Sequence, residues 1–239
     1  MINDSNARVD AGNSLKIYEE FRELGFAAGI TLKGPWADQK IIYQFVKDRI
    51  MARNLHLVVP EQVHGSEVVY LGNDDSNFQF EADGVIAVRP GLCLTVTTAD
   101  CLPLLLADPV SGLFAAVHIG WRSYVAGILE NLFGVARGKG LNKGETKVFL
   151  GPAIGPCCFQ VGWDVAILFD EKFLDFRYNS VYVNLREAAR NKLLLLGVDE
   201  DNMRGVPDCT SCDMKHYYSY RRDKESPLQM VSFIYKLPI

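Results

Sequence analysis

LCLTVTTADCLPLLLADPVSGLFAAVHIGW, residues 92–121, contains three short apolar runs separated by Asp, Pro and Gly. Runs of this length, bounded by turn-forming residues, predict strands at 92–98, 102–107 and 113–118. Three similar runs precede them, at 55–59, 67–71 and 84–88. Because these strands follow one another in a block instead of alternating with helices, we expect an α+β fold with antiparallel or mixed pairing rather than a doubly wound sheet.

Outside this block, apolar residues repeat with helical spacing. The spacing predicts helices at 14–24, 38–53, 122–137, 163–172 and 185–196. The helix at 122–137 is expected to be the longest and to end at Gly138 and Gly140. Further strands complete the prediction, at 147–150 and near 203–206, 216–220 and 229–236.

The domain organisation follows from length and composition. The chain has 239 residues, of which 49% are hydrophobic and 23% charged, as in ordinary globular proteins. One core supports this length, and the sequence contains no linker, internal repeat or shift in composition that would divide it. We therefore expect a single domain spanning residues 1–239.

Charge and cysteine content narrow the function. A net charge of −4 argues against nucleic acid as a partner, since that affinity comes mainly from clustered Lys and Arg, and favours a small-molecule substrate. Residues 1–10 lack the pattern of a secretory signal, and no apolar run is long enough to cross a membrane. The six cysteines are thus expected to be thiols or metal ligands in a cytoplasmic protein. The sequence does not define the oligomeric state.

Two histidines and one cysteine stand at the ends of predicted strands. They are His64 in Glu61-Gln-Val-His-Gly65, Cys101 after Thr97-Thr-Ala-Asp100, and His118 in Ala116-Val-His-Ile-Gly-Trp121. If these strand ends converge, two imidazoles and one thiolate form a zinc-binding set that leaves the fourth tetrahedral position open, as in a catalytic site. Taken singly, each residue is more often a buried core residue than a ligand.

Six segments, taken in order, resemble a known family. They are Gln62-Val-His-Gly65, Ala82-Asp-Gly84, Thr98-Ala-Asp-Cys-Leu-Pro103, His118-Ile-Gly-Trp-Arg122, Leu150-Gly-Pro-Ala-Ile-Gly-Pro156 and Ser219-Tyr-Arg-Arg-Asp223. They resemble the laccase-domain family, called multicopper polyphenol oxidases and now purine nucleoside phosphorylases, which includes a bacterial peptidoglycan editing factor. The resemblance covers most of the chain after residue 60. Two departures are Ile119, where the family usually has Ala, and the N-terminal third, which matches poorly.

The resemblance implies an α+β fold of layered mixed sheets flanked by helices, with zinc at His64, Cys101 and His118. It also implies a zinc-dependent purine nucleoside phosphorylase with adenosine deaminase and methylthioadenosine phosphorylase activity, whose substrates are purine nucleosides and phosphate.

Two basic segments are candidate anion sites. Arg122 follows a strand at the start of the helix predicted at 122–137, where free N–H groups favour phosphate; the alternative is a surface Arg lying over Trp121. Arg221 and Arg222 are adjacent on a predicted strand, so only one faces the site. We favour Arg222 as the substrate-binding residue; the alternative is a structural pair with Asp223.

Three polar residues beside the ligands are further candidates. Asp100 either orients a ligand imidazole, acts in proton transfer, or forms a turn. Asp83 is interpreted first as a turn residue. Gln62 shares the face of His64 and is a candidate substrate contact, or else it faces solvent.

The remaining thiols carry a weaker signal. Cys157, Cys158, Cys209 and Cys212 would in principle hold a second metal ion or form a redox pair, but a single C-x-x-C without a neighbouring βαβ pattern is weak support.

Three other functions stay open. A copper-dependent polyphenol oxidase, with copper in place of zinc, is disfavoured because multicopper centres need many more than the four histidines present. An amidase or hydrolase that edits peptidoglycan precursors would use Cys101 as nucleophile and His118 as base, without metal. A non-enzymatic protein would have a closed, structural zinc site.

Overall fold

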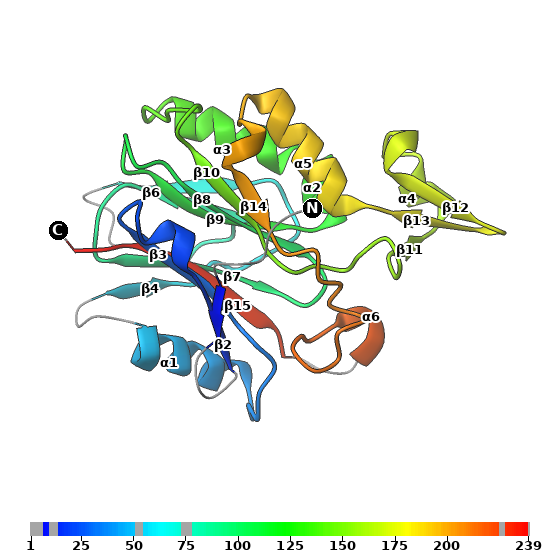
Figure 1. Cartoon of the computed structure of the whole chain (residues 1–239), viewed down its shortest axis with the longest axis horizontal. Coiled ribbons are helices and arrows are strands. Elements are labelled where there is room, and N and C mark those ends of the chain that lie inside the picture. The colour runs from blue at the N-terminus through cyan, green and yellow to red at the C-terminus, as the bar shows by residue number, and fades with distance from the viewer. Residues whose placement is uncertain (1–6, 10–13, 51–54, 73–77, 225–227, 239) are drawn as a thin grey trace.

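The computed structural model describes residues 7–9, 14–50, 55–72, 78–224 and 228–238, which form two stacked sheets with helices on their outer faces (Figure 1). The sheet drawn uppermost in Figure 1 has the order β14-β10-β8-β9-β6-β5. Its strands are β14 (Met203–Gly205), β10 (Lys147–Leu150), β8 (Leu102–Ala107), β9 (Phe114–Ile119), β6 (Gly84–Ala87) and β5 (Val68–Leu71). The β10–β14 and β5–β6 pairs are parallel and the others antiparallel, so the sheet is mixed.

The second large sheet has the order β1-β2-β3-β15-β7-β4. Its strands are β1 (Ala7–Val9), β2 (Leu15–Tyr18), β3 (Phe26–Thr31), β15 (Met230–Lys236), β7 (Leu92–Thr98) and β4 (His56–Val58). Only the β4–β7 pair is parallel among these described strands.

Strand β8 explains why the central apolar runs lack polar positions. Leu102, Leu104 and Leu106 belong to the core beneath the helices, whereas Leu105 and Ala107 belong to the core between the sheets. Side chains of a strand alternate between its two faces, so a strand covered on both faces is apolar throughout.

Helices cover the outer faces of both sheets. Helix α1 (Gln39–Ile50) packs Ile42 and Val46 against the second sheet. Helices α3 (Ile128–Arg137) and α5 (Leu185–Leu196) cover the first sheet, next to the short helix α2 (Trp121–Val125). The layered α+β expectation is confirmed, and no helix among the described residues is long and apolar enough to cross a membrane.

A small sheet, β11-β13-β12, lies at one end of the molecule beside helix α4 (Trp163–Ala166) (Figure 1). Its strands are β11 (Gln160–Val161), β12 (Leu174–Arg177) and β13 (Ser180–Val183). Helix α6 (Tyr220–Asp223) and the 3-10 helices η1 (Glu19–Phe21), η2 (Glu171–Phe173) and η3 (Glu200–Asn202) complete the described elements.

Three predicted elements are wrong. Residues 14–24 form β2 and η1, because pairing with β1 and β3 overrides the helical spacing of their apolar residues. Residues 163–172 form only α4 before the chain turns into η2. Residues 216–220 are no strand: Ser219 accepts a hydrogen bond from the N–H of Arg222 and so caps α6.

Two predicted helices are confirmed with changes. The helix predicted at 122–137 is broken into α2 and α3 by Gly127, whose φ of 86° is left-handed and cannot continue a helix. The expectation that it is the longest helix is therefore wrong, since α3 has 10 residues and α1 and α5 have 12 each. The helix predicted at 38–53 is present as α1, and positions 51–53 lie outside the described residues. Strands β1, β3, β11, β12 and β13 were not predicted.

Candidate metal centre and cavity

The structure brings His64, Cys101 and His118 together. One ligand atom from each lies within 4.8 Å of those of the other two, and the two imidazole rings meet edge to face with centroids 4.7 Å apart. The register of β8 and β9 explains part of this meeting, because Pro103 pairs with His118 and Cys101 is only two residues before Pro103. Strand ends distant in sequence thus meet as expected.

Gly120 makes the approach of the ligands possible. A Cβ atom at this position would lie 2.8 Å from Nδ1 of His64 and 3.3 Å from Sγ of Cys101. Any side chain would therefore displace the ligands, and the glycine two residues after His118 is required by space rather than by its own φ.

The carboxylate that orients a ligand imidazole is Asp83, not Asp100. Oδ1 of Asp83 lies 2.7 Å from Nδ1 of buried His118. Because a carboxylate only accepts, Nδ1 carries a proton, which leaves Nε2 as the ring atom for a metal. Sequence reasoning passed over Asp83 as a turn residue, although a ligating histidine usually has such a partner.

Asp83 also holds the loop that carries His64. Its carboxylate accepts hydrogen bonds from the backbone N–H groups of Val63 (3.2 Å), His64 (3.0 Å) and Gly65 (2.6 Å). These bonds stabilise His64 in a left-handed conformation with φ of 57°, which is uncommon outside glycine. One buried carboxylate thus fixes the backbone of one ligand and the ring of another.

Without a metal, the electrostatics favour an ion pair between a Cys101 thiolate and a protonated His118, so a metal that binds here would displace the Nε2 proton of His118. Burial would raise the pKa of Cys101, but hydrogen bonds and positive charge from His118 and His64 outweigh it and lower the pKa to about 7. Burial would lower the pKa of His118, yet its bonds to Asp83 and Cys101 raise it to about 9. Burial likewise opposes ionisation of Asp83, but hydrogen bonds from His118 and Gly65 lower its pKa.

The residues fit an open zinc site better than a closed, structural one. Two imidazoles and a thiolate are borderline-soft donors of the kind that zinc prefers, and three ligands leave a tetrahedral ion one free position. Among the residues that the structure describes, no fourth His, Cys, Asp or Glu joins this group. The donor set is therefore that of an open site.

The three ligands lie on the wall of a cavity of about 850 Å³. This volume is in the range of small-molecule sites. Aromatic and cationic side chains also line it, namely Trp121, Phe159, Tyr220, Arg122, Arg221 and Lys224. Such a lining suits a ligand with a flat ring and a negative charge.

Gln62 and Asp100 line the cavity but are engaged by the protein. The amide of Gln62 donates to the carbonyl of Thr97 (2.8 Å) and accepts from its N–H (2.7 Å), which ties the His64 loop to the end of β7. The carboxylate of Asp100 accepts from the Thr210 hydroxyl and the Arg221 N–H, both at 2.6 Å. Both residues position backbone.

Of the two adjacent arginines, Arg221 faces the cavity and Arg222, which we favoured from sequence, does not. Arg221 lines the cavity, and its guanidinium donates to the carbonyls of Cys158 and Gln160. Arg222 is not among the lining residues; it pairs with Asp223 and donates to the carbonyls of Thr210, Ser211 and Tyr217. These contacts of Arg222 are those of the alternative interpretation, a structural pair with Asp223.

Arg122 combines both interpretations made from sequence. Its guanidinium carbon lies 4.3 Å from the Trp121 ring centre, so it stacks on that ring. It also lines the cavity, and within the described part of the chain no carboxylate pairs with it.

Comparison with known proteins identifies relatives. The family model described as multi-copper polyphenol oxidoreductase laccase matches residues 42–236. A purine nucleoside phosphorylase, YfiH of Shigella flexneri, is 34% identical over 183 residues, which cover 73% of this chain and 72% of that protein. The purine nucleoside phosphorylase YlmD of Geobacillus stearothermophilus is 31% identical over 191 residues, covering 73% and 70%.

Solved structures extend the likeness to nearly the whole fold. The crystal structure of a hypothetical protein YfiH from Bacillus licheniformis superposes with a TM-score of 0.86 at 26% identity, covering 98% of this chain and 100% of that one. YlmD from Geobacillus stearothermophilus gives 0.84 at 25% identity, covering 98% and 99%. The N-terminal region therefore shares the fold although its sequence matches less well.

Proposed function

Because the chain belongs to the multi-copper polyphenol oxidoreductase laccase family, we propose that it is a zinc-dependent purine nucleoside phosphorylase that also deaminates adenosine and cleaves methylthioadenosine. The observation that carries this proposal is the convergence of His64, Cys101 and His118 on the wall of a large cavity lined by aromatic and cationic groups. Relatives named purine nucleoside phosphorylase support the substrate class. The cytoplasmic location stays a prediction.

His64, Cys101 and His118 would hold the zinc ion, and Asp83 keeps His118 in the tautomer that binds metal. When bound, zinc supplies a Lewis acid at the cavity wall, the chemistry that hydrolysis of the adenosine amino group needs. In this proposal Cys101 and His118 act as ligands. Asp100 positions the Arg221 backbone rather than moving a proton.

Phosphate binding is assigned to the cationic groups of the cavity. Arg122, Arg221 and Lys224 are lining residues, and Arg122 is held over Trp121 with its N–H donors available. Phosphorolysis needs an anion held in line with the bond between ribose and base, so that positive charge developing on the sugar is stabilised. These side chains supply that anion pocket.

The purine ring is assigned to the aromatic part of the cavity. Trp121, Phe159 and Tyr220 line it. Flat bases stack on such rings with a gain of about 1–3 kcal/mol per base. Stacking tolerates different bases, which agrees with activity on both inosine and adenosine.

The test is a set of parallel reactions with one metal analysis. The purified protein is incubated with inosine, adenosine or methylthioadenosine, with and without phosphate and chelator, and products are separated by chromatography. We expect hypoxanthine and adenine release that requires phosphate, inosine formation that does not, and loss of both reactions on chelation. Cys101→Ala should lose metal and turnover, whereas Cys93→Ala, at a buried thiol of β7 outside the site, should keep both. Base release without phosphate would refute phosphorolysis.

The second candidate is the metal-free amidase or hydrolase with Cys101 as nucleophile and His118 as base, and the lowered pKa of Cys101 beside His118 favours it. Alkylation separates the two functions. A Cys–His hydrolase would be inactivated equally with or without zinc, whereas a zinc-ligating Cys101 is protected when zinc is present. The copper oxidase has only the family's name in its support, and copper at the site with thiolate charge-transfer absorption would restore it.

A further inference from the structure

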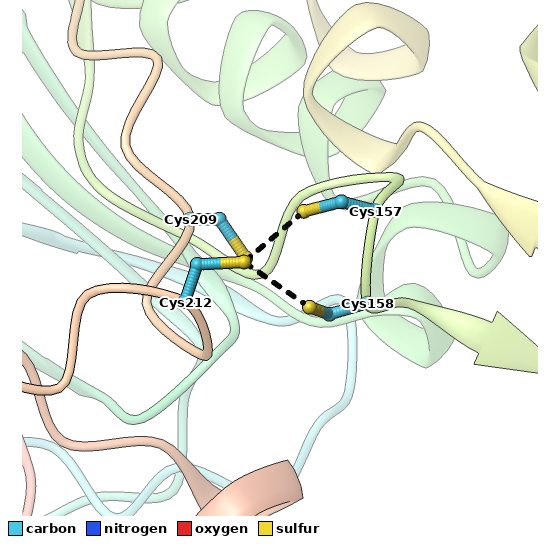
Figure 2. Close-up of side chains that lie close together, drawn as sticks. All are labelled: Cys157, Cys158, Cys209 and Cys212. Carbon is cyan, nitrogen blue, oxygen red and sulfur yellow. Dashed lines mark hydrogen bonds between the residues drawn. The ribbon is translucent and has the colours of Figure 1, made fainter.

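A second group of metal-ligand side chains lies outside the cavity. The thiols of Cys157, Cys158, Cys209 and Cys212 point toward one another from two loops (Figure 2). All four sulfur atoms lie within 4.8 Å of one another. Sγ of Cys212 is 3.5 Å from that of Cys157 and 3.4 Å from that of Cys158.

The sheet topology brings these loops together. Strands β10 and β14 are parallel neighbours, so the chain leaves both at the same edge of the sheet. The two exit segments continue side by side, with a parallel bridge between Ala153 and Cys209. This pairing brings Cys157 and Cys158 next to Cys212, more than fifty positions away in sequence.

The sulfur spacing is that of ligands around one ion. A tetrahedral zinc with Zn–S bonds of about 2.3 Å has neighbouring sulfurs about 3.8 Å apart, whereas a disulfide joins sulfurs at about 2.05 Å. All four cysteines are free. An iron–sulfur cluster binds its thiolates through different iron atoms and needs them further apart than this group allows.

The backbone around the thiols is shaped for them. The N–H of Gly155 donates to Sγ of Cys209 at 3.2 Å. A Cβ at Gly155 would lie 3.2 Å from both Sγ of Cys157 and Cβ of Cys209, so a side chain here would crowd the two cysteines. The carbonyl of Cys209 accepts from the N–H groups of Cys212 and Asp213, which closes the C-x-x-C turn.

Arginines surround the two loops. Their guanidinium groups donate to carbonyls of the same segments, in the pairs Arg177 with Pro156, Arg186 with Asp208, Arg221 with Cys158, and Arg222 with Thr210 and Ser211. Four thiolates and one Zn²⁺ carry a net charge of −2. Arg177 and Arg222 are paired with Asp175 and Asp223, so Arg186 and Arg221 are the cations of this group that would offset that charge.

We propose that Cys157, Cys158, Cys209 and Cys212 bind one zinc ion in a closed, structural site that is separate from the site at His64, Cys101 and His118. Binding releases the thiol protons to solvent and involves no redox step. With all four positions taken by thiolates, the ion has no place for a substrate. The site fastens one wall of the cavity, because Cys158 holds Arg221 and Thr210 holds Asp100.

Metal stoichiometry in the full-length chain tests the proposal. The protein is made metal-free under reducing conditions, reconstituted with Zn²⁺ and analysed by native mass spectrometry; a parallel titration with Co²⁺ follows the visible bands of tetrahedral thiolate sites. We expect two ions in the wild type and in Cys93→Ala, and one ion in either His64→Ala or Cys212→Ser.

The single-site variants identify the ion that remains. In His64→Ala, X-ray absorption should detect sulfur ligands only; in Cys212→Ser, it should detect mixed nitrogen and sulfur. One ion in the wild type, lost in His64→Ala, would overturn the proposal, as would a disulfide among the four cysteines in the freshly reduced and reconstituted protein. Should Cys212→Ser fold poorly, the count in the wild type and the ligands in His64→Ala decide alone.

Discussion

Asp83→Asn offers the sharpest test of how the metal centre is built. Oδ1 of Asp83 accepts from His118 and His64, and Oδ2 accepts from Gly65 and Val63. An asparagine keeps one oxygen and replaces the other by an NH₂ group, which donates. Whichever way the amide turns, two N–H donors lose their acceptor. If the NH₂ group faces His118, the ring must move its proton to Nε2, the atom that should bind zinc.

The magnitude follows from these contacts. A buried donor without an acceptor costs about 1–3 kcal/mol. Two donors are lost, but in either orientation of the amide one of them belongs to an exposed residue, Val63 or His64, where water replaces part of the bond. We therefore expect a loss of about 2–4 kcal/mol in the free energy of unfolding. Loss of a partner that orients a ligating histidine weakens metal binding by about 10–100-fold.

The assay is a competition between the protein and a chromogenic chelator for zinc, read together with urea unfolding. Asp108→Asn is the matched control, because Asp108 is also fully buried and accepts hydrogen bonds from Val110, Ser111 and Asn142, none of them a metal ligand. It should lose comparable stability and keep its zinc affinity. Asp83→Asn binding zinc within twofold of the wild type would refute the reasoning, and so would an equal loss of affinity in the control.

Three further predictions rest on single contacts. Gly120→Ala should lower zinc occupancy severely, because its Cβ would lie 2.8 Å from Nδ1 of His64. The control Gly134→Ala, with open space around it, should change stability by no more than about 1 kcal/mol and leave zinc bound. Metal analysis measures both, and full occupancy in Gly120→Ala would contradict the packing argument. Arg122→Ala should raise KM for phosphate by about 10- to 100-fold, since a charge-assisted hydrogen bond contributes roughly 1.5–3 kcal/mol, and should leave the zinc content unchanged. An unaltered KM would remove Arg122 from the anion pocket. Arg222 lowers the pKa of Asp223, so the pair stabilises the fold at pH values above the ordinary pKa of a carboxyl group, and this contribution is lost as pH falls through the lowered pKa. In Arg222→Ala, the free energy of unfolding in urea should therefore fall less steeply with decreasing pH than in the wild type. Identical slopes in the two proteins would exclude the pair.

The convergence of His64, Cys101 and His118 was predictable from sequence because these residues stand at strand ends within segments that resemble one family. Asp83 was not, since aspartate before glycine is common in turns and its acceptors are used by partners 18 to 35 residues away. Arg221 rather than Arg222 lines the cavity for a local reason. The Ser219 cap turns the segment into a helix, so the alternation expected of a strand does not apply.

The fold was predictable where apolar runs are covered on both faces, as in β7, β8 and β9. Short elements such as β2 and β11 were not, because their pairing with other strands, rather than their own pattern, makes them strands. The four thiols carried a weak signal for the same reason. Only the parallel pairing of β10 with β14 makes the loops neighbours.

Strand β15 occupies the middle of its sheet, between β3 and β7, although it is the furthest of these strands along the chain. During synthesis, β3 and β7 emerge long before the strand that joins them, and their inner edges have no hydrogen-bond partner until residues 230–236 leave the ribosome. Completion of this sheet therefore waits for β15 and depends on non-local contacts, which slows folding. Meanwhile the waiting edges are a natural binding target for chaperones.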